Sequence, residues 1–359
     1  MRKQHNNNLL LTKECGSIGD YQLTGERVYQ AVEKLKPIVH RTPLITSETT
    51  NKIVGKHVYF KMENQQKTGA FKFRGATFKL MQLSKNQLKK GVITASAGNH
   101  AQGVAYAASK IGVQATIFMP EQTPTAKVEA TKTYGAEVVL TGASFQEAYE
   151  ASMKTQLQTG AVYVHPFDDY DIMAGQGTIA MEMLKQEDRI DTFIVPIGGG
   201  GLISGIAVAA KHVNKNIRII GVQSQNSRAM YNLYHNETPK DYVPTRTIAE
   251  GIDVKEPGKL TSQVIREYVD EVVTVTDEEI AASVLYMLER NKTLMEGAGA
   301  AALAALFAYT DQIKSRYCGV IVSGGNIDIS SIPHIQRLAD NRQQAPRMEP
   351  PNFNSTVSL

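Results

Sequence analysis

Apolar and polar residues follow two distinct rhythms along the chain. In 56–64, "KHVYFKMEN", polar and apolar residues alternate, which is typical of a half-buried strand. In 24–39, "TGERVYQAVEKLKPIV", apolar residues recur at helical spacing until Pro37. The predicted strands lie within 41–47, 56–64, 91–100, 114–124, 136–142, 161–169, 191–201, 217–224 and 318–326. The predicted helices lie within 24–39, 101–112, 125–135, 144–160, 174–186, 202–213, 278–294 and 296–309.

Short apolar strands that alternate with helices predict mostly parallel sheets with helices on both faces. The fold class is therefore α/β. These strands are too many for one doubly wound sheet, so we expect two open twisted sheets in two stacked domains. The expected divisions are an N-terminal arm at 1–21, a large domain from 22–88 plus 168–335, a small domain at 89–167, and a disordered tail at 336–359.

Composition narrows the function classes. The 359 residues are 42% hydrophobic and 21% charged, as in an ordinary globular protein, and the net charge of +4 is scattered, so we expect no nucleic-acid partner. Cys15 and Cys318 are too few for a disulfide framework or a metal site, and we expect reduced thiols. The sequence has neither a signal-peptide core nor an apolar run of ~18–20 residues, so we expect no membrane contact and a cytoplasmic location.

The segment "QKTGAFKFRGATFKL", 65–79, places Lys72 between Phe71 and Phe73. One interpretation is the start of an amphipathic helix whose lysine reaches out to water. The other is an amine whose charged form is disfavoured, so that it can act as a nucleophile. This segment alone leaves both interpretations open.

Four consecutive glycines, Gly198–Gly201, stand between an apolar strand and a helix. Without Cβ atoms, their amides can converge on an anion at the helix N-terminus. The loop lacks both the dinucleotide spacing and the lysine of a nucleotide-binding loop. A phosphate monoester therefore fits better than a pyrophosphate, and a plain tight turn is the alternative.

Three further loops carry polar residues at comparable positions. Ser96 and Asn99 precede a helix, where they could bind a carboxylate or phenolic oxygen or simply cap the helix. Ser323 ends an apolar strand, and Glu296 precedes an apolar helix, where a glutamate is also ordinary. Together with Lys72, these loops offer an amine, a phosphate cradle, an amide and a hydroxyl, which match the groups of pyridoxal phosphate.

Six motifs in order, TGAFKFRGA, ASAGNHAQGVA, HPFDD, AGQGT, GGGGLISG and SGGN, resemble those of the threonine/serine ammonia-lyases, or threonine deaminases. These enzymes have the type II pyridoxal phosphate fold, which is tryptophan synthase β-like. The resemblance runs from about Val28 to about Asp328. It implies pyridoxal 5′-phosphate as the cofactor and Lys72 as the lysine bonded to its aldehyde. The implied cofactor-binding residues are Lys72, Phe71, Asn99, Gly198, Gly199, Gly200, Gly201, Leu202 and Ser323. We expect Phe71 and Phe73 to disfavour the ammonium form of Lys72.

The reaction implied by the resemblance is a β-elimination. The substrate amine displaces Lys72, the freed amine removes the Cα proton, and the β-hydroxyl leaves. L-threonine would give 2-oxobutanoate and ammonia, and L-serine would give pyruvate. The substrate carboxylate would be held by the loop amides of Ser96, Ala97, Gly98, Asn99 and His100. Further candidate site residues are Glu296, Gly251 and Phe167, the last as a pocket wall or as ordinary packing.

Two alternatives accompany this hypothesis. Serine racemases resemble the same scaffold but carry a second serine directly before Gly-Asn-His, and Ala97 stands there in this chain, which favours the dehydratase. A non-catalytic amino-acid-binding protein would have no use for a desolvated lysine. Gln223 and Ala229 stand where some relatives place carboxylate ligands, so we expect no divalent metal.

The resemblance leaves the physiological role open between isoleucine biosynthesis and threonine catabolism. It implies a homodimer or a homotetramer. Since 336–359 is too short for an amino-acid-sensing domain, we expect little feedback inhibition by isoleucine.

Overall fold

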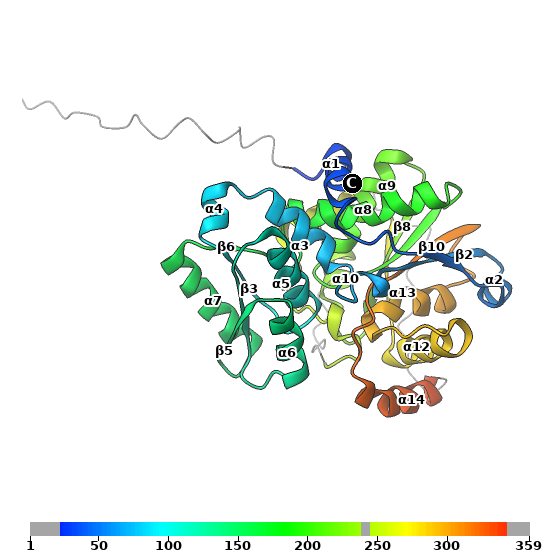
Figure 1. Ribbon diagram of the computed structural model, residues 1–359. Coiled ribbons are helices and arrows are strands. Elements are labelled where there is room, and N and C mark those ends of the chain that lie inside the picture. Colours follow the sequence, from blue (N-terminus) through cyan, green and yellow to red (C-terminus); the bar gives the residue numbers. More distant parts are fainter. Residues whose placement is uncertain (1–21, 238–244, 343–359) are drawn as a thin grey trace, which may run out of the picture.

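The computed structural model describes residues 22–237 and 245–342. It contains two α/β units, each built on its own sheet, which we call the larger and the smaller layer. In Figure 1 the smaller layer, with α4 to α7 in cyan to green, stands beside the larger one. The expected α/β fold with two mostly parallel sheets is confirmed. Cys15 lies outside the described residues, and Cys318 is a buried free thiol.

The larger sheet has six strands in the order β1-β2-β10-β7-β8-β9. Only β1 runs antiparallel to its neighbour, β2, among these strands. The strands are β1 (Leu44–Thr46), β2 (His57–Met62), β10 (Tyr317–Val322), β7 (Thr192–Pro196), β8 (Arg218–Ser224) and β9 (Glu271–Val275). Most of their residues are buried on both faces, as parallel strands between helices require.

Helices cover both faces of the larger sheet. One face packs against α1 (Gly25–Leu35), α8 (Tyr170–Gln186), α9 (Gly201–Val213), α10 (Ala229–Tyr234) and α11 (Lys259–Tyr268). The other packs against α2 (Glu48–Val54), α12 (Asp277–Asn291), α13 (Gly297–Ala308) and α14 (Ile332–Asp340). Short 3₁₀ turns lie at η1 (Glu63–Gln65), η2 (Glu250–Ile252) and η3 (Ile329–Ser331).

The smaller sheet has four parallel strands in the order β5-β4-β3-β6. They are β5 (Glu137–Leu140), β4 (Ala115–Met119), β3 (Val92–Ala95) and β6 (Val162–Tyr163). The helices of this layer are α4 (Lys85–Lys89), α5 (Asn99–Ile111), α6 (Thr125–Thr133) and α7 (Phe145–Thr159). Helix α3 (Lys72–Met81) packs against both α5 and α8, so it joins the two layers.

Local sequence sets several helix boundaries. Thr24 accepts a hydrogen bond from the Arg27 amide and starts α1, which ends at Leu35. Proline at 37 cannot supply a helical amide, so the helix stops just before it. Asp169 caps α8 through the amides of Asp171 and Ile172.

Three sequence expectations differ from the structure. The buried strand β9 was missed. The expected strand at 161–169 is only β6, and the residues after it form the loop that leads to α8. The tail expected from residue 336 is helical as far as 340, because α14 packs against α12 and buries Ile335. Within 22–237 and 245–342, no helix has the length and apolar character to span a bilayer.

Candidate active site

The chain before Lys72 is tied to the end of β10. The Phe71 amide donates to the Ser323 carbonyl at 3.1 Å, and the Gly325 amide donates to the Gly69 carbonyl at 2.9 Å. Ser323 follows the last residue of β10, where ligands of parallel sheets usually bind. The hydrogen bonds therefore bring the start of α3 to that edge of the larger sheet.

Lys72 is the first residue of α3, and its amine faces the loop after β6. Its Nζ donates to the carbonyl oxygen of Pro166 at 2.7 Å. Burial lowers the pKa of Lys72 from 10.5 to about 8, although the Glu296 carboxylate acts in the opposite direction. The amine is thus half-buried and can exchange a proton near neutral pH.

The two phenylalanines do not act on Lys72 together, as the sequence suggested. The Phe71 ring centroid is 5.3 Å from Lys72 Nζ, and a cation over a ring face is attracted to it. Phe73 is fully buried and packs against Tyr106, with 5.1 Å between ring centroids. Phe73 thus packs elsewhere, while burial of the amine lowers the pKa of Lys72 and so disfavours its ammonium form.

The glycine run forms the turn from β7 into α9. Gly200 has φ +96°, and a Cβ there would lie 2.8 Å from the Thr261 Cβ, so only glycine fits. The Thr261 hydroxyl donates to the Gly199 carbonyl at 2.7 Å and fixes the turn. Gly201 and Leu202 begin α9, where the amides of the first helical turn have no acceptor within the helix.

Phe167 packs directly against this turn. A Cβ at Gly199 would overlap the Phe167 ring, and one at Gly201 would lie 2.9 Å from the Phe167 Cα. A Cβ at Gly198 would lie 3.1 Å from the Cα of Ile252 on η2. Larger side chains do not fit in this run, because other parts of the chain, including Phe167, approach it closely.

Asp168 supports the glycine turn indirectly, and the sequence analysis missed it. Its Oδ1 accepts hydrogen bonds from the amides of Leu260 at 2.8 Å and Thr261 at 3.0 Å, at the start of α11. The Asp168 amide in turn donates to Nδ1 of His165 at 2.8 Å. Asp168 and Leu260 are 92 residues apart, so no local pattern indicated this contact.

Asn99, Glu296 and Gly251 come together beside the glycine turn. Asn99 Nδ2 donates to Glu296 Oε1 at 2.7 Å, and Asn99 Oδ1 accepts from Asn326 Nδ2 at 2.8 Å. A Cβ at Gly251 would lie 3.3 Å from Glu296 Oε1. The carbonyl of Gly251 is also 3.5 Å from the position of a Cβ at Gly198, so these groups adjoin the glycine turn.

The loop from Ser96 to His100 offers fewer donors than expected. The Ser96 amide donates to Phe118 O at 3.0 Å, and Ser96 Oγ accepts from the Gly98 amide at 3.3 Å. The His100 ring is turned to the carbonyl of Val164 at 2.9 Å, and burial lowers its pKa to about 3. The Ser96 amide is therefore not available to a ligand, and the His100 ring is uncharged.

Helix α5 begins at Asn99, so the Asn99 and His100 amides lie in its first turn and have no acceptor within the helix. A Cβ at Gly98 would meet nothing within 4 Å, so the loop borders open space there. Ala97 is half-buried at this edge. The Ser323 hydroxyl lies at the other side of the site and donates to the Ala298 carbonyl at 3.3 Å.

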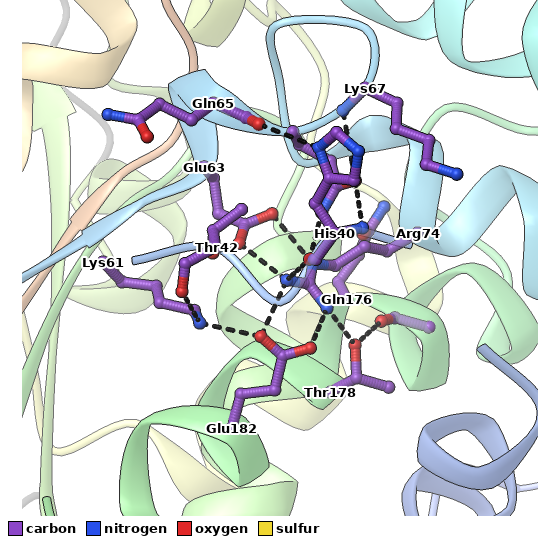
Figure 2. A network of polar contacts seen from close by, with 12 residues as sticks. His40, Thr42, Lys61, Glu63, Gln65, Lys67, Arg74, Gln176, Thr178 and Glu182 are labelled. Carbon is purple, nitrogen blue, oxygen red and sulfur yellow. Dashed lines mark hydrogen bonds and ion pairs between the residues drawn. The ribbon is translucent and has the colours of Figure 1, made fainter. Parts of the chain in front are cut away.

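A buried cluster of charged residues surrounds Arg74 in the first turn of α3, and Figure 2 shows its polar contacts. Arg74 makes two 2.8 Å hydrogen bonds to the Glu63 carboxylate and also binds Glu182, at 2.7 Å. Lys61 Nζ binds the same Glu182 at 2.7 Å. Burial would raise the pKa of Glu63, and the Arg74 guanidinium outweighs it, so that pKa is lowered.

This cluster joins β2, η1, α3 and α8, and its two positive charges balance two negative ones. Arg74, Glu63 and Lys61 are fully buried, and such charges persist only when they are paired. The sequence analysis did not single out this cluster. The arginine two positions after Lys72 was the available signal.

The residues at the possible divalent metal position form a different structure. Gln223 is buried, its Nε2 donates to Ile197 O at 3.3 Å, and its Oε1 accepts from the Tyr231 amide at 2.7 Å. Ala229 begins α10. No group of three or more His, Cys, Asp or Glu side chains with ligand geometry occurs in the described part of the chain.

The site fits the expected cofactor. Side chains at Gly199, Gly200 and Gly201 would collide with their neighbours, so the loop leaves bare amides for a phosphate. Lys72 supplies an amine with a lowered pKa for an aldehyde. Asn99 supplies an amide donor, and Ser323 supplies a neutral hydroxyl.

Comparisons with known proteins agree with this arrangement. A family model described as "Pyridoxal-phosphate dependent enzyme" matches residues 35–324. An L-threonine ammonia-lyase of Geobacter sulfurreducens is 50% identical over 308 residues, which cover 85% of this chain and 76% of that protein. An L-threonine ammonia-lyase of Thermotoga maritima is 46% identical over 313 residues, which cover 87% and 78%. Among solved structures, maize serine racemase superposes with a TM-score of 0.83 at 37% identity and covers 90% of this chain and 100% of that one.

Proposed function

This chain belongs to the family of pyridoxal-phosphate dependent enzymes, and from that premise we propose that it deaminates L-threonine to 2-oxobutanoate and ammonia. L-serine is a second substrate and gives pyruvate. The observation that carries the proposal is the half-buried Lys72 amine, whose pKa of about 8 suits it to work as a base near neutral pH. We also propose that the enzyme works in the cytoplasm as a homodimer or a homotetramer.

The site geometry supports the cofactor-binding residues that the family resemblance implies. The amides of Gly198 to Gly201 and Leu202 would bind the phosphate, and the α9 N-terminus would add positive potential. Asn99 would donate to the 3′ oxygen, and the Ser323 hydroxyl would face the ring nitrogen. When bound, pyridoxal phosphate withdraws electrons from the substrate Cα and makes its proton acidic.

Lys72 then acts on the substrate itself. Once the substrate amine has freed it, its neutral amine accepts the proton from Cα, and the Pro166 carbonyl can accept a hydrogen bond from the freed amine. The substrate carboxylate binds the free amides at the start of α5, those of Asn99 and His100. The His100 ring stays neutral and turned away, so the carboxylate is held by main-chain donors and the helix dipole.

Racemisation of serine is the second candidate, since the fold also matches a serine racemase. A racemase needs a proton donor on the face opposite the lysine. The methyl side chain of Ala97 cannot transfer a proton. We therefore expect elimination to outrun racemisation in this chain.

The test measures 2-oxoacid release by the holoenzyme from L-threonine, L-serine and D-serine, together with serine enantiomers resolved by chiral chromatography. We expect release from L-threonine, slower release from L-serine, and no D-serine formation. Lys72→Ala should lose at least about 10³-fold in kcat, because it removes the base. Undiminished release by this variant, or conversion of L-serine to D-serine faster than to pyruvate, would overturn the proposal.

A further inference from the structure

The side chain of Asn99 is held at both ends of its carboxamide. Its Nδ2 donates to Glu296 Oε1 at 2.7 Å, and its Oδ1 accepts from Asn326 Nδ2 at 2.8 Å. Asn326 Nδ2 is itself fixed by a second bond, to the carbonyl of Thr68 at 2.8 Å. Three residues from α5, the start of α13 and the loop after β10 thus form one chain of hydrogen bonds.

The chemistry of the two neighbours fixes which way Asn99 faces. An ionised carboxylate can only accept hydrogen bonds, so Glu296 selects the NH₂ end of Asn99. Asn326 presents an NH₂ group to the other end, because that group also donates to a main-chain carbonyl. If the Asn99 carboxamide were flipped, its oxygen would face the Glu296 carboxylate and its NH₂ group would face the NH₂ group of Asn326. Only one orientation of Asn99 is therefore satisfied.

Glu296 occupies a space shaped for its carboxyl group. It precedes α13 as the cap residue, yet its side chain makes no hydrogen bond to that helix. A Cβ at Gly324 would lie 2.5 Å from Glu296 Oε1, and one at Gly251 would lie 3.3 Å from it. A larger residue at either glycine would push the carboxyl group away from Asn99.

We propose that Glu296 is a positioning residue, which acts through Asn99 by holding its carboxamide with an N–H group toward the 3′ oxygen of pyridoxal phosphate. The inference rests on the proposed function, since it needs that cofactor in the site. One proton of Asn99 Nδ2 is used by Glu296, and the second remains for the cofactor. Without Glu296 the carboxamide can rotate and present its oxygen, which would repel the oxygen of the cofactor.

The charged groups around Glu296 come from three elements. Lys72 on α3 interacts with its carboxylate, Lys127 on α6 lowers its pKa, and Glu250 on η2 raises it. Burial is the largest cause and raises the pKa of Glu296 to about 7, while the hydrogen bond from Asn99 lowers it. A protonated Glu296 still has a carbonyl oxygen that can accept from Asn99, so both forms can hold the carboxamide.

The experiment titrates purified apoprotein with pyridoxal phosphate and records both the dissociation constant and the absorption spectrum of the bound cofactor. Glu296→Ala should bind at least about tenfold more weakly, with a shifted absorption maximum. Glu296→Gln should stay within about threefold of the parent, because its amide oxygen still accepts from Asn99. The control Glu129→Gln removes an exposed carboxylate on α6 and should bind like the parent chain.

A double variant shows whether Glu296 acts through Asn99. In an Asn99→Ala background, Glu296→Ala should cause no further loss of cofactor affinity. An additional tenfold loss there would overturn the inference, as would a Glu296→Ala protein with the parent affinity and spectrum. If Glu296→Ala does not fold, Glu296→Leu, which also lacks an acceptor for Asn99, takes its place in the two backgrounds, and its absorption spectrum should shift only when Asn99 is present. A parent apoprotein that binds no cofactor would instead refute the proposed function.

Discussion

Lys72 should cost the apoprotein stability, and its replacement by methionine should recover it. Burial lowers the pKa of Lys72 from 10.5 to about 8, which corresponds to about 3 kcal/mol at about 1.4 kcal/mol per pKa unit. The hydrogen bond from Nζ to Pro166 O offsets about 1 kcal/mol of this, since methionine cannot make it. We therefore expect the free energy of unfolding of the Lys72→Met apoprotein at pH 7 to be about 2 kcal/mol higher than that of the parent apoprotein.

The pH dependence gives the sign of the effect. Below pH 8 the amine is charged in both the folded and the unfolded chain, so the folded state bears the whole cost. Between pH 8 and 10.5 the folded chain gives up its proton before the unfolded one does. The advantage of Lys72→Met should therefore be largest near neutral pH and disappear as the pH approaches 10.5.

Urea denaturation of both apoproteins at several pH values measures this difference. Lys79→Met on the same helix is the matched control, because Lys79 pairs with Asp169 at 2.6 Å and its loss should destabilise the chain. The reasoning is refuted if Lys72→Met is no more stable than the parent at pH 7. A stability gain that does not change between pH 7 and 10 would refute the titration argument alone.

Three further predictions concern the surroundings of the site. Gly200→Ala should weaken binding of pyridoxal phosphate to the apoprotein at least about tenfold, because φ is +96° and the new Cβ would meet Thr261. An unchanged dissociation constant would contradict this prediction. Arg74→Met should lower the free energy of unfolding, measured in urea, by about 3–5 kcal/mol, because it leaves Glu63 buried without its partner. A decrease of less than about 1 kcal/mol would show that the cluster rearranges to compensate. Lys127 and Glu250 pair at 2.9 Å between the two layers, and reversing the charge of either residue alone should raise KM about two- to fivefold. Exchanging the two charges should restore the parent KM, and no restoration would show that the pair does not act across the layers.

Most of the strands could be predicted because the apolar runs are bounded by glycine, proline or polar loops. The structure confirms nine of them, with β6 much shorter than expected. The tenth strand, β9, carries the buried run EVVTV, whose β-branched residues were a usable signal. It was missed because no glycine or proline separates it from the helices on either side. Helix α14 was missed because its amphipathic pattern was assigned to a tail.

Loop chemistry could be read from the sequence, but contacts between loops could not. The glycine run predicted bare amides, and the structure adds their cause, which is the close approach of Phe167 and Thr261. The contact of Lys72 with Pro166 spans 94 residues, and that of Asn99 with Glu296 spans 197. Such pairings depend on the order of strands in two sheets, which no local pattern determines. The packing of Phe73 against Tyr106 could not be predicted for a related reason, since neighbours on a helix point in different directions.

Helix α3 explains why the chemistry needs both layers. It packs against α5 of the smaller layer and α8 of the larger one, so Lys72 lies where the two meet. The buried cluster around Arg74 fixes α3 to β2 and α8, two residues beyond the reactive amine. The larger layer therefore holds the amine and the glycine turn rigidly together, while Asn99 and the free amides come from α5 of the smaller layer. The site is therefore complete only where the two layers meet, because neither layer alone carries both the amine and the amides of α5.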